Sequence, residues 1–481
     1  MSEIEIEKVS KNVYKIPKKD GMNVPARVYA SEQLLEAIKG DKTLQQIKNV
    51  AHLPGIQKFA AVMPDGHQGY GFPIGGVAAL DTEKGGISPG GVGYDINCGV
   101  KVVKTDIEAE KIYDRAEQLA NILYQKIPSG TGKGGIADIS SDSEFDEVLE
   151  KGLEWAKEEG YATEKDVKRC EDGGKMEEAD ASKVSEKAKN RGRDQVGSLG
   201  SGNHFLEIQK VEEVYDKKVA EEYGLEKGKA LIMIHCGSRG LGHQICSDYV
   251  RRIEKERPEL IDELPDKELA YAPGESALAE DYFGAMASAV NFAWANRQVI
   301  ASKVRESFER IFNQSWEELG MEVLYDVAHN VAKKEKHKIN GEEKEVYIHR
   351  KGSTRAFPPG REEVPDKYRD VGQPIILPGS MGTSSYILKG GEKSLNLSFG
   401  STAHGAGRLM SRTKAKDKYW GEDVQKELKR DKILVKAQSG STIAEEAPGA
   451  YKDVDEVVKV SDQLGIGNKV VRLKPIANIK G

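Results

Sequence analysis

Five side chains with metal-binding chemistry stand in turns or at strand ends of this sequence. Asp95 and Cys98 lie three residues apart in the glycine-rich turn GGVGYDINCGV, whose backbone can fold both side chains toward one point. His204, His235 and His329 each stand at one end of an apolar, strand-like segment, next to a turn residue or a glycine. Such placement is typical of a site assembled at one edge of a sheet. Together the donors predict a site for a divalent ion such as zinc, iron or manganese, and a thiolate can bridge two such ions.

Each of these residues alone has a plainer interpretation. A buried free cysteine is more often structural than metal-bound, and a single histidine in a turn is more often a structural residue. The donors come from distant parts of the chain, so the sequence leaves their convergence open. Asp65 and His67, in the glycine-rich loop MPDGHQGYGFPIGG, are candidates for orienting the ligands through hydrogen bonds. His52, His337 and His349 lie among polar residues, and we expect them to be solvated.

A second group of motifs suits phosphate chemistry. The loop LPGSMGTSSYIL (Leu377–Leu388) offers backbone amides freed by glycines together with four hydroxyl side chains, which can cradle an anion. Close behind it, SFGSTAHGAGR surrounds His404 with glycine, serine and alanine, so its imidazole can approach a phosphorus atom as a nucleophile. Arg408, four residues on, can hold the oxygens of the transition state. The plainer alternative is a turn histidine beside an arginine that pairs with a carboxylate.

One glycine-rich motif does not fit a nucleotide site. GTGKGG (residues 130–135) matches the GxGxxG pattern, but the preceding LANILYQKIPS indicates a helix and no βαβ context follows. It is not a P-loop either, because Lys133 is followed by glycine instead of serine or threonine. The stretch predicts a plain loop.

The composition describes a folded chain without a general attraction for polyanions. Hydrophobic residues make up 38% and charged residues 31%, whereas disorder would need far fewer apolar groups. With a net charge of -6, any nucleic-acid binding must come from a local basic patch. Four scattered cysteines without a CxxC motif predict reduced thiols, and no segment resembles a signal region or a membrane span. We therefore expect a cytosolic protein without a membrane partner.

The elements that must position these residues are both strands and helices. The segments GVKVVKTDI, HFLEIQKV, KALIMIHCG and EVLYDVAHN are expected as strands, whereas the segment from Phe283 to Phe312 predicts a long amphipathic helix. Asn340-Gly341 predicts a two-residue turn in a protruding charged hairpin around residues 333–350. Charge dominates around residues 158–193, which indicates a mobile helical insertion or lid. With no repeat and no clean linker, we expect one domain spanning residues 1–481.

Five motifs, in this order, resemble the RtcB family of GTP-dependent RNA ligases. They are DINCGV, GSLGSGNHFLEI, HCGSRGLGHQI, PGSMGTSSYIL and GSTAHGAGR, and the similarity runs from about Met63 to Gly481. The resemblance implies an α+β fold of layered, mostly antiparallel sheets flanked by helices, with the active site at strand ends. It also implies an enzyme that joins RNA ends with a 3′-phosphate or 2′,3′-cyclic phosphate to 5′-hydroxyl ends, in tRNA splicing and RNA repair.

The resemblance also assigns roles to residues and partners. It implies two manganese ions, one held by Asp95, Cys98 and His204 and the other by Cys98, His235 and His329, although a thiolate by itself would favour zinc. It implies that His404 attacks the α-phosphorus of GTP and passes GMP to the RNA 3′-phosphate. It further implies tRNA halves as substrates and an archease-type activator. The implied guanylate contacts are Asn203, His204, Glu207, Asn330, Pro378, Gly379, Ser380, Met381, Ser385, His404, Gly405, Ala406, Gly407 and Lys480.

RNA must reach this site in an acidic protein, so we expect a basic surface. Its candidate residues are Arg239, Lys351, Arg355, Arg408 and Arg412, and we expect Arg408 and Arg412, with Asn203, to contact the RNA end. Two other functions would use the same metal ligands: a dinuclear metal phosphoesterase or nuclease, and a metal-stabilised RNA-binding protein without catalysis. Neither needs a guanylate pocket, so the two phosphate motifs favour the ligase. The KxDG motif of lysine-based nucleotidyl transferases is absent from the sequence.

Overall fold

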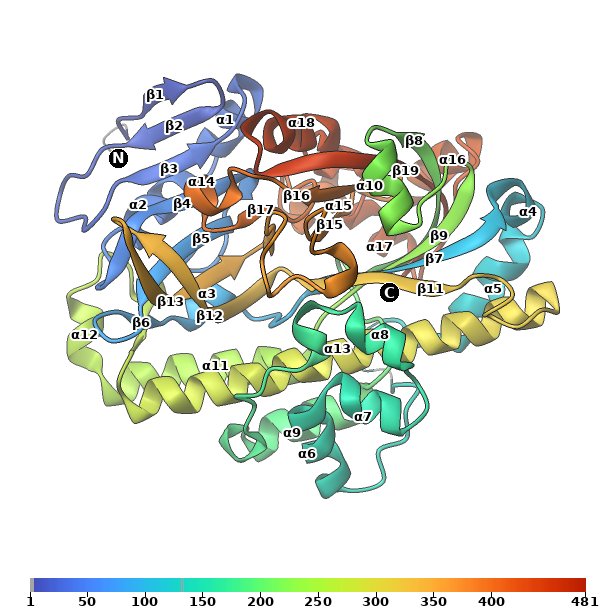
Figure 1. The fold of residues 1–481 in the computed structure, drawn as a ribbon, viewed down its shortest axis with the longest axis horizontal. Coiled ribbons are helices and arrows are strands. Elements are labelled where there is room, and N and C mark those ends of the chain that lie inside the picture. The colour runs from blue at the N-terminus through green and yellow to red at the C-terminus, as the bar shows by residue number, and fades with distance from the viewer. Residues whose placement is uncertain (1–3, 131, 133) are drawn as a thin grey trace.

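Two large sheets form the framework of the molecule. The computed structural model describes residues 4–130, 132 and 134–481 (Figure 1). One sheet has seven strands in the order β1-β2-β3-β4-β5-β13-β12, and the other has eight, in the order β11-β7-β9-β8-β19-β16-β15 with β18 beside β19. The pairing is antiparallel except between β3 and β4 and between β18 and β19. The expected α+β class is confirmed.

The strands of the seven-stranded sheet are β1 (Glu7–Ser10), β2 (Val13–Ile16), β3 (Ala26–Tyr29), β4 (Ile56–His67), β5 (Ile74–Asp81), β12 (Asn330–Ile339) and β13 (Glu342–Lys351). Those of the eight-stranded sheet are β7 (Gly99–Glu108), β8 (Phe205–Val214), β9 (Lys229–Cys236), β11 (Glu322–Ala328), β15 (Pro374–Leu377), β16 (Ser385–Gly390), β18 (Leu434–Lys436) and β19 (Gly467–Lys480). Two short pairs complete the strands: β6 (Gly86–Ile87) with β10 (Ala272–Pro273), and β14 (Ser353–Arg355) with β17 (Ser401–Ala403).

The four strands expected from apolar patterning are confirmed, and all belong to the eight-stranded sheet. They are β7, β8, β9 and β11, which follow one another as neighbours at one side of that sheet. Their inward side chains, such as Val100, Val102 and Met233, are completely buried. Because these neighbours run antiparallel, the starts of β7 and β8 lie at the same edge as the ends of β9 and β11.

The long helix is confirmed but is not amphipathic along its whole length. Helix α13 (Ala277–Phe312) begins after Ser276, whose side chain caps the first turn by accepting a hydrogen bond from the Ala279 backbone. Every residue from 282 to 301 is buried. The helix runs along the eight-stranded sheet and packs against α6 (Asp142–Lys151), α7 (Leu153–Glu158) and α11 (Arg239–Glu256) (Figure 1). A helix that is enclosed on all sides needs no polar face.

The charged segment around residues 158–193 forms short helices that are anchored to this core. It contains α8 (Glu164–Lys168) and α9 (Glu186–Gly192), and α9 packs against α11. The Asp166 carboxylate of α8 accepts two hydrogen bonds from the Arg305 guanidinium of α13, at 2.7 and 2.8 Å. The buried ion pair between Asp166 and Arg305 thus anchors the segment to α13, in addition to its covalent connections to the rest of the chain.

The hairpin of β12 and β13 turns at Asn340 and Gly341, whose φ angles are 52° and 94°. Its inner half is not protruding, because β13 pairs with β5 from Val346 to Lys351. His337 and His349 are buried, which corrects the expectation that they are solvated. Alternate residues of each strand face the core, where His337 Nε2 lies 2.9 Å from a Glu335 oxygen and His349 Nε2 accepts a hydrogen bond from the Ser88 amide. His52 is half-buried.

The remaining α-helices of the described residues complete the fold. They are α1 (Glu32–Lys39), α2 (Thr43–Val50), α3 (Pro89–Val92), α4 (Ala109–Tyr113), α5 (Ala116–Lys126), α10 (Lys217–Tyr223), α12 (Pro258–Asp262), α14 (Ser394–Ser398), α15 (Arg412–Lys418), α16 (Gly421–Arg430), α17 (Gly440–Glu445) and α18 (Val454–Leu464). In the part of the chain that the structure describes, no helix combines the length and the hydropathy that a bilayer crossing needs.

The GTGKGG stretch follows α5, the helix expected before it. Its described glycines belong to no helix or strand, and Thr131 and Lys133 lie outside the described residues.

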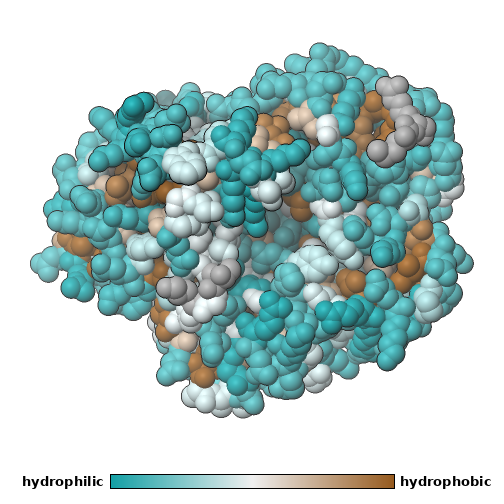
Figure 2. Space-filling model, turned by 180° about the vertical axis from the view of Figure 1, so that it is seen from behind, coloured by the Kyte–Doolittle hydropathy of each residue, from teal (hydrophilic) through white to brown (hydrophobic). Residues whose placement is uncertain are grey.

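The four cysteines are buried and free, so no disulfide joins them. The face opposite to that of Figure 1 is mostly hydrophilic and is hollowed near its centre (Figure 2).

Candidate active site

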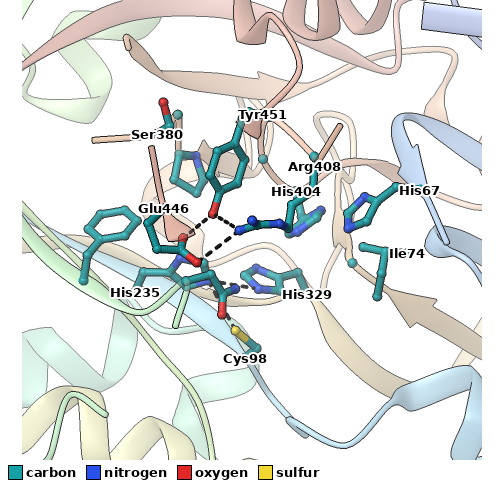
Figure 3. A pocket seen from close by; sticks show the side chains of 18 of the residues that line it. His67, Ile74, Cys98, His235, His329, Ser380, His404, Arg408, Glu446 and Tyr451 are labelled. Carbon is teal, nitrogen blue, oxygen red and sulfur yellow. Dashed lines mark hydrogen bonds and ion pairs between the residues drawn. The ribbon is translucent and has the colours of Figure 1, made fainter. Parts of the chain in front are cut away.

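The candidate site is a cavity of about 220 Å³. Residues from both large sheets line it, together with Gly352 and His404, which flank the short β14–β17 pair, and Figure 3 shows how the side chains converge. It brings together most of the residues singled out from the sequence: His67, Asp95, Cys98, Asn203, His235, His329, Asn330, Pro378, Gly379, Ser380, Met381, His404, Gly405, Ala406, Gly407, Arg408, Arg412 and Lys480.

Five metal-binding side chains form two overlapping groups. Cys98 Sγ lies 3.5 Å from His204 Nε2 and 3.3 Å from His235 Nε2. His235 Nε2 lies 3.3 Å from His329 Nε2, and Asp95 Oδ2 lies 2.8 Å from His204 Nε2. The ligand atoms of Cys98, His235 and His329 lie within 4.8 Å of one another, and so do those of Asp95, Cys98 and His204. These groups coincide with the two ligand sets that the family resemblance implies, with the thiol common to both.

Antiparallel register explains this convergence. The start of β7 pairs with the ends of β9 and β11, since Gly99 lies opposite both Cys236 and Ala328. The start of β8 pairs with the end of β9, where Phe205 lies opposite His235. Residues that just precede β7 and β8 therefore meet residues that end β9 and β11 at one edge of the sheet.

A buried arginine, which sequence reasoning missed, holds the backbone around the donors. Arg297 of α13 donates from Nη1 to the carbonyl oxygens of Asn97 and Cys236, at 2.9 and 2.8 Å. Its Nε donates to Asp326 Oδ1 at 2.8 Å. These three acceptors lie next to Cys98, next to His235 and on the strand that leads to His329. In the sequence, Arg297 gives no signal beyond its place in a helical repeat.

The electrostatics of Asp95, His235 and His329 fit divalent cations. Burial lowers the pKa of His235 and His329 well below the ordinary value, so both imidazoles are neutral and have a free lone pair. Burial would raise the pKa of Asp95, but the neighbouring His204 and Arg239 hold it at about 2, so the carboxylate is ionised. Burial raises the pKa of the Cys98 thiol to about 12, and a bound cation would supply the charge that favours the thiolate.

His404 is oriented by a buried carboxylate. It directly follows β17, and its Nδ1 donates to Asp65 Oδ2 at 2.6 Å. The same oxygen accepts from the His404 amide at 3.0 Å and from the Gly405 amide at 3.3 Å. Burial would raise the pKa of Asp65, but His404 and Lys452 lower it, so the carboxylate stays ionised. The ring centroid of His404 lies 4.7 Å from that of His329. Asp65 thus orients His404 and not a metal donor.

The loop from Pro378 to Met381 forms another wall of the cavity. The hydroxyl of Ser385 accepts a hydrogen bond from the Gly379 amide at 3.0 Å, which fixes the loop from behind. Ser385 and Glu207 do not themselves line the cavity. Both receive a hydrogen bond from the Gln209 side chain, and burial raises the pKa of Glu207 to about 7.

Glu446 is a second residue that sequence reasoning missed. It lines the cavity, and its carboxylate is fully buried. Arg408 Nη1 lies 3.1 Å from Glu446 Oε1, and Lys480 Nζ lies 3.2 Å from Oε2. The Tyr451 hydroxyl donates to the same carboxylate (Figure 3). Arg408 therefore pairs with a carboxylate, as its plainer interpretation predicts, while it also faces the cavity. The AEEAPG stretch around Glu446 offers no sequence signal for this role.

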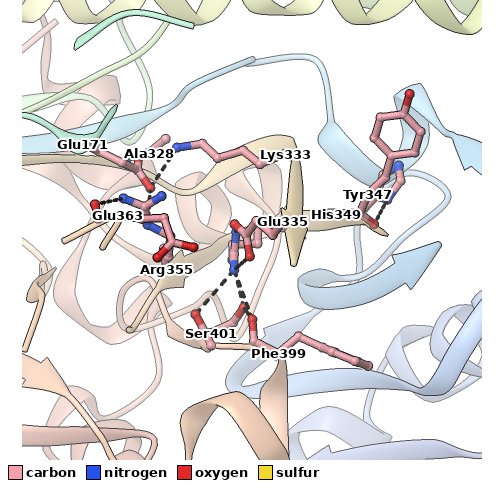
Figure 4. A network of polar contacts seen from close by, with 12 residues as sticks. Glu171, Ala328, Lys333, Glu335, Tyr347, His349, Arg355, Glu363, Phe399 and Ser401 are labelled. Atoms are coloured by element: carbon pink, nitrogen blue, oxygen red, sulfur yellow. Dashed lines mark hydrogen bonds and ion pairs between the residues drawn. The ribbon is translucent and has the colours of Figure 1, made fainter. Parts of the chain in front are cut away.

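Two residues of the expected basic surface are buried. Lys351 is 3% exposed and donates to the Gly90 carbonyl at 3.0 Å. Arg355 is 2% exposed and forms ion pairs with Glu171 (Figure 4) and with Asp172. Both are excluded from RNA contact because their charges are used inside the fold. Arg239 is half-buried, and its guanidinium donates to His204 Nδ1 at 2.8 Å.

Comparison with known proteins gives similar chains, several of which have nearly the same length. A family model described as tRNA-splicing ligase RtcB matches residues 46–481. The tRNA-splicing ligase RtcB of Thermococcus kodakarensis is 51% identical over 479 residues, which cover 99% of each chain. That of Pyrobaculum aerophilum is 51% identical over 486 residues and the whole of both chains. That of Methanococcus maripaludis is 50% identical over 478 residues, or 99% of each chain.

Proposed function

Because this chain belongs to the RtcB family of tRNA-splicing ligases, we propose that it joins RNA ends at the expense of GTP. The substrates are an RNA end with a 3′-phosphate or 2′,3′-cyclic phosphate and one with a 5′-hydroxyl, such as tRNA halves. The observation that carries this proposal is the position of His404, which shares one cavity with two metal-binding groups and the Pro378–Met381 loop.

Two divalent ions fit the donors, and the family resemblance makes them manganese. Asp95, Cys98 and His204 would hold one, and Cys98, His235 and His329 the other. When bound, the ions supply positive charge against the triphosphate and its leaving group.

The protein residues account for the nucleotidyl transfer. Asp65 keeps the proton of His404 on Nδ1, so the lone pair of Nε2 is directed at the α-phosphorus of GTP. A bond forms between Nε2 and phosphorus while the bond to the bridging oxygen breaks and pyrophosphate leaves. The Met381 amide of the Pro378–Met381 loop holds a phosphate oxygen, because the Gly379 and Ser380 amides already donate to Ser385 and Thr383. The guanylate is selected by Asn203, Asn330 and Lys480, which line the cavity, and by Glu207, which lies behind the cavity wall.

The joining steps follow from the same site. An oxygen of the RNA 3′-phosphate attacks the phosphorus of histidine-bound GMP, and His404 is released. The 5′-hydroxyl oxygen then attacks the RNA 3′-phosphorus, and GMP leaves with the electron pair. A cyclic phosphate is first opened by water. Arg408 and Arg412 hold the RNA end, and an archease-type activator is expected for turnover.

The test is the covalent intermediate. The protein is incubated with manganese and GTP labelled at the α-phosphate, without RNA, and then denatured. We expect acid-labile, alkali-stable label in wild type and in His52→Ala, a histidine that does not line the cavity, and none in His404→Ala.

The competing metal phosphoesterase predicts a different pattern. Folded, metal-loaded protein would carry no label, and RNA would be shortened without any nucleotide. That result would replace the ligase proposal. A protein that left RNA intact and carried no label would be an RNA-binding protein.

A further inference from the structure

The segment from Arg408 to Trp420, here called the basic segment, leads away from the cavity. It contains five basic side chains and one acidic one, a net charge of +4 in a chain of net charge -6. Arg408 and Arg412 line the cavity, and a Cβ on Gly202 would lie 2.4 Å from the Arg412 guanidinium. Helix α15, which begins at Arg412, is about 9 Å long at the usual rise per residue.

The outer part of the basic segment has charges that the fold does not use. Lys416 forms an ion pair with Glu445 at 2.7 Å. Lys414 and Lys418 are exposed, and neither forms an ion pair with any described residue. The neighbouring helix α16 differs, because its three basic side chains are matched by three acidic ones.

An aromatic side chain stands at the end of this path. Trp420 is 70% exposed, the highest value among the exposed large hydrophobic residues, and Leu409 near the cavity is 51% exposed. Because its indole is exposed to solvent, Trp420 does not contribute to the hydrophobic core. Exposed aromatic groups interleaved with unpaired lysines are the combination that binds single-stranded nucleic acid, since bases stack on the ring and phosphates meet the ammonium groups.

We propose that the basic segment is the docking surface for single-stranded RNA leading to the reacting end. Lys414 and Lys418 contact backbone phosphates, and a base stacks on Trp420. The inference rests on the proposed ligase function and adds the surface by which the substrate is held. It also replaces the buried Lys351 and Arg355 as the source of positive charge for RNA.

The test measures RNA affinity and guanylylation in parallel. Binding of a 3′-phosphorylated, single-stranded RNA oligonucleotide to full-length, manganese-loaded protein is followed by fluorescence anisotropy over a range of salt concentrations. The variants are Lys414→Gln/Lys418→Gln and Trp420→Ala. The matched control is Lys429→Gln/Lys432→Gln, which removes the same charge from exposed lysines of the adjacent segment.

We expect the Lys414/Lys418 variant to reduce the slope of log affinity against log salt by about 1.4, or roughly 0.7 per lost phosphate contact. Trp420→Ala should weaken binding roughly 5- to 150-fold, whereas Trp420→Phe should retain much of the affinity. RNA should quench tryptophan fluorescence more strongly in wild type than in Trp420→Phe, because Trp155 and Trp294 are buried and Trp316 is half-buried. Labelling by GTP without RNA should be unchanged in all these variants.

Equal affinities for the Lys414/Lys418 variant and its control, or an unchanged affinity in Trp420→Ala, would overturn the inference and leave the segment to a protein partner. If wild type labels with GTP but shows either of these results, the ligase proposal stands and only the docking surface fails. If wild type neither labels nor binds RNA, both fail.

Discussion

At the scale of single residues, the contact between Asp65 and His404 decides which nitrogen can act as the nucleophile. One oxygen of the carboxylate accepts hydrogen bonds from Nδ1–H and from two backbone amides, which leaves Nε2 free. A neutral amide in its place could donate as well as accept, so the ring would no longer be restricted to one tautomer.

We therefore predict that Asp65→Asn slows guanylylation by roughly 10²- to 10⁴-fold. The rate of label transfer from GTP in a single turnover is the measurement. Equilibrium GTP affinity should change little, so kcat falls while KM is nearly preserved. Unimpaired labelling by Asp65→Asn would mean that the Nδ1 contact is dispensable.

The residue types and their spacing were sufficient to identify Cys98, the three strand-end histidines and His404 as candidates. They could not identify Glu446 or Arg297, because the roles of these side chains depend on partners far along the chain. The same limit led to the error at Lys351 and Arg355. Their charge indicated solvent, but buried acceptors hold both.

At the scale of elements, α13 is a support for the metal-binding edge. Through Arg297 it joins the turn before β7, the end of β9 and the strand β11. Apolar patterning predicted each of these elements, since alternation is strong in buried strands. It could not predict their order in the sheet, which is set by long-range pairing.

Replacing Arg297 with lysine keeps the positive charge but removes the planar fork that reaches several acceptors. We predict that Arg297→Lys weakens metal binding about 10- to 100-fold, as measured by metal titration. Arg305→Lys is the control, because Arg305 lies on the same helix but pairs with Asp166. Equal metal affinities in the two variants would remove the positioning role of Arg297.

The ion pair between Asp166 and Arg305 should make the stability of the protein depend on pH. Burial would raise the pKa of Asp166, but Arg305 lowers it below the ordinary value of 3.8. A lowered folded-state pKa contributes stability that is present above the unfolded value and is lost as the pH falls through the folded one. Asp166→Asn should cost about 3–5 kcal/mol at neutral pH, and the difference from wild type should shrink below about pH 4. Unfolding free energies between neutral pH and about pH 3 measure this. A constant difference would contradict the assignment.

At the scale of the whole molecule, the candidate site exists only where separate parts of the fold meet. The seven-stranded sheet contributes Asp65, the eight-stranded sheet supports the metal donors, and the β14–β17 pair leads to His404. The donors span residues 95 to 329, so ion binding links segments that are distant in the chain. This is also why one domain, rather than an active fragment, is expected.

We predict that manganese raises the unfolding temperature of wild type and that Cys98→Ala abolishes both the rise and the bound metal. A ligand at 100 times its Kd stabilises the native state by about 2.7 kcal/mol per site. Elemental analysis and thermal unfolding, with and without a chelator, are the measurements. A Cys98→Ala protein that retained two ions would refute the shared thiolate.

The position of β19 has a consequence for biosynthesis. This strand lies between β8 and β16 in the eight-stranded sheet, yet it is made after both of them. A ribosome-bound chain lacking residues 467–480 would leave three strands without their β19 partner: β8 beside the metal donors, β16 near the Pro378–Met381 loop, and β18. The nascent protein thus passes through a stage at which it is inert as an enzyme and exposed to mispairing, and chaperone protection at that stage would be of greatest value.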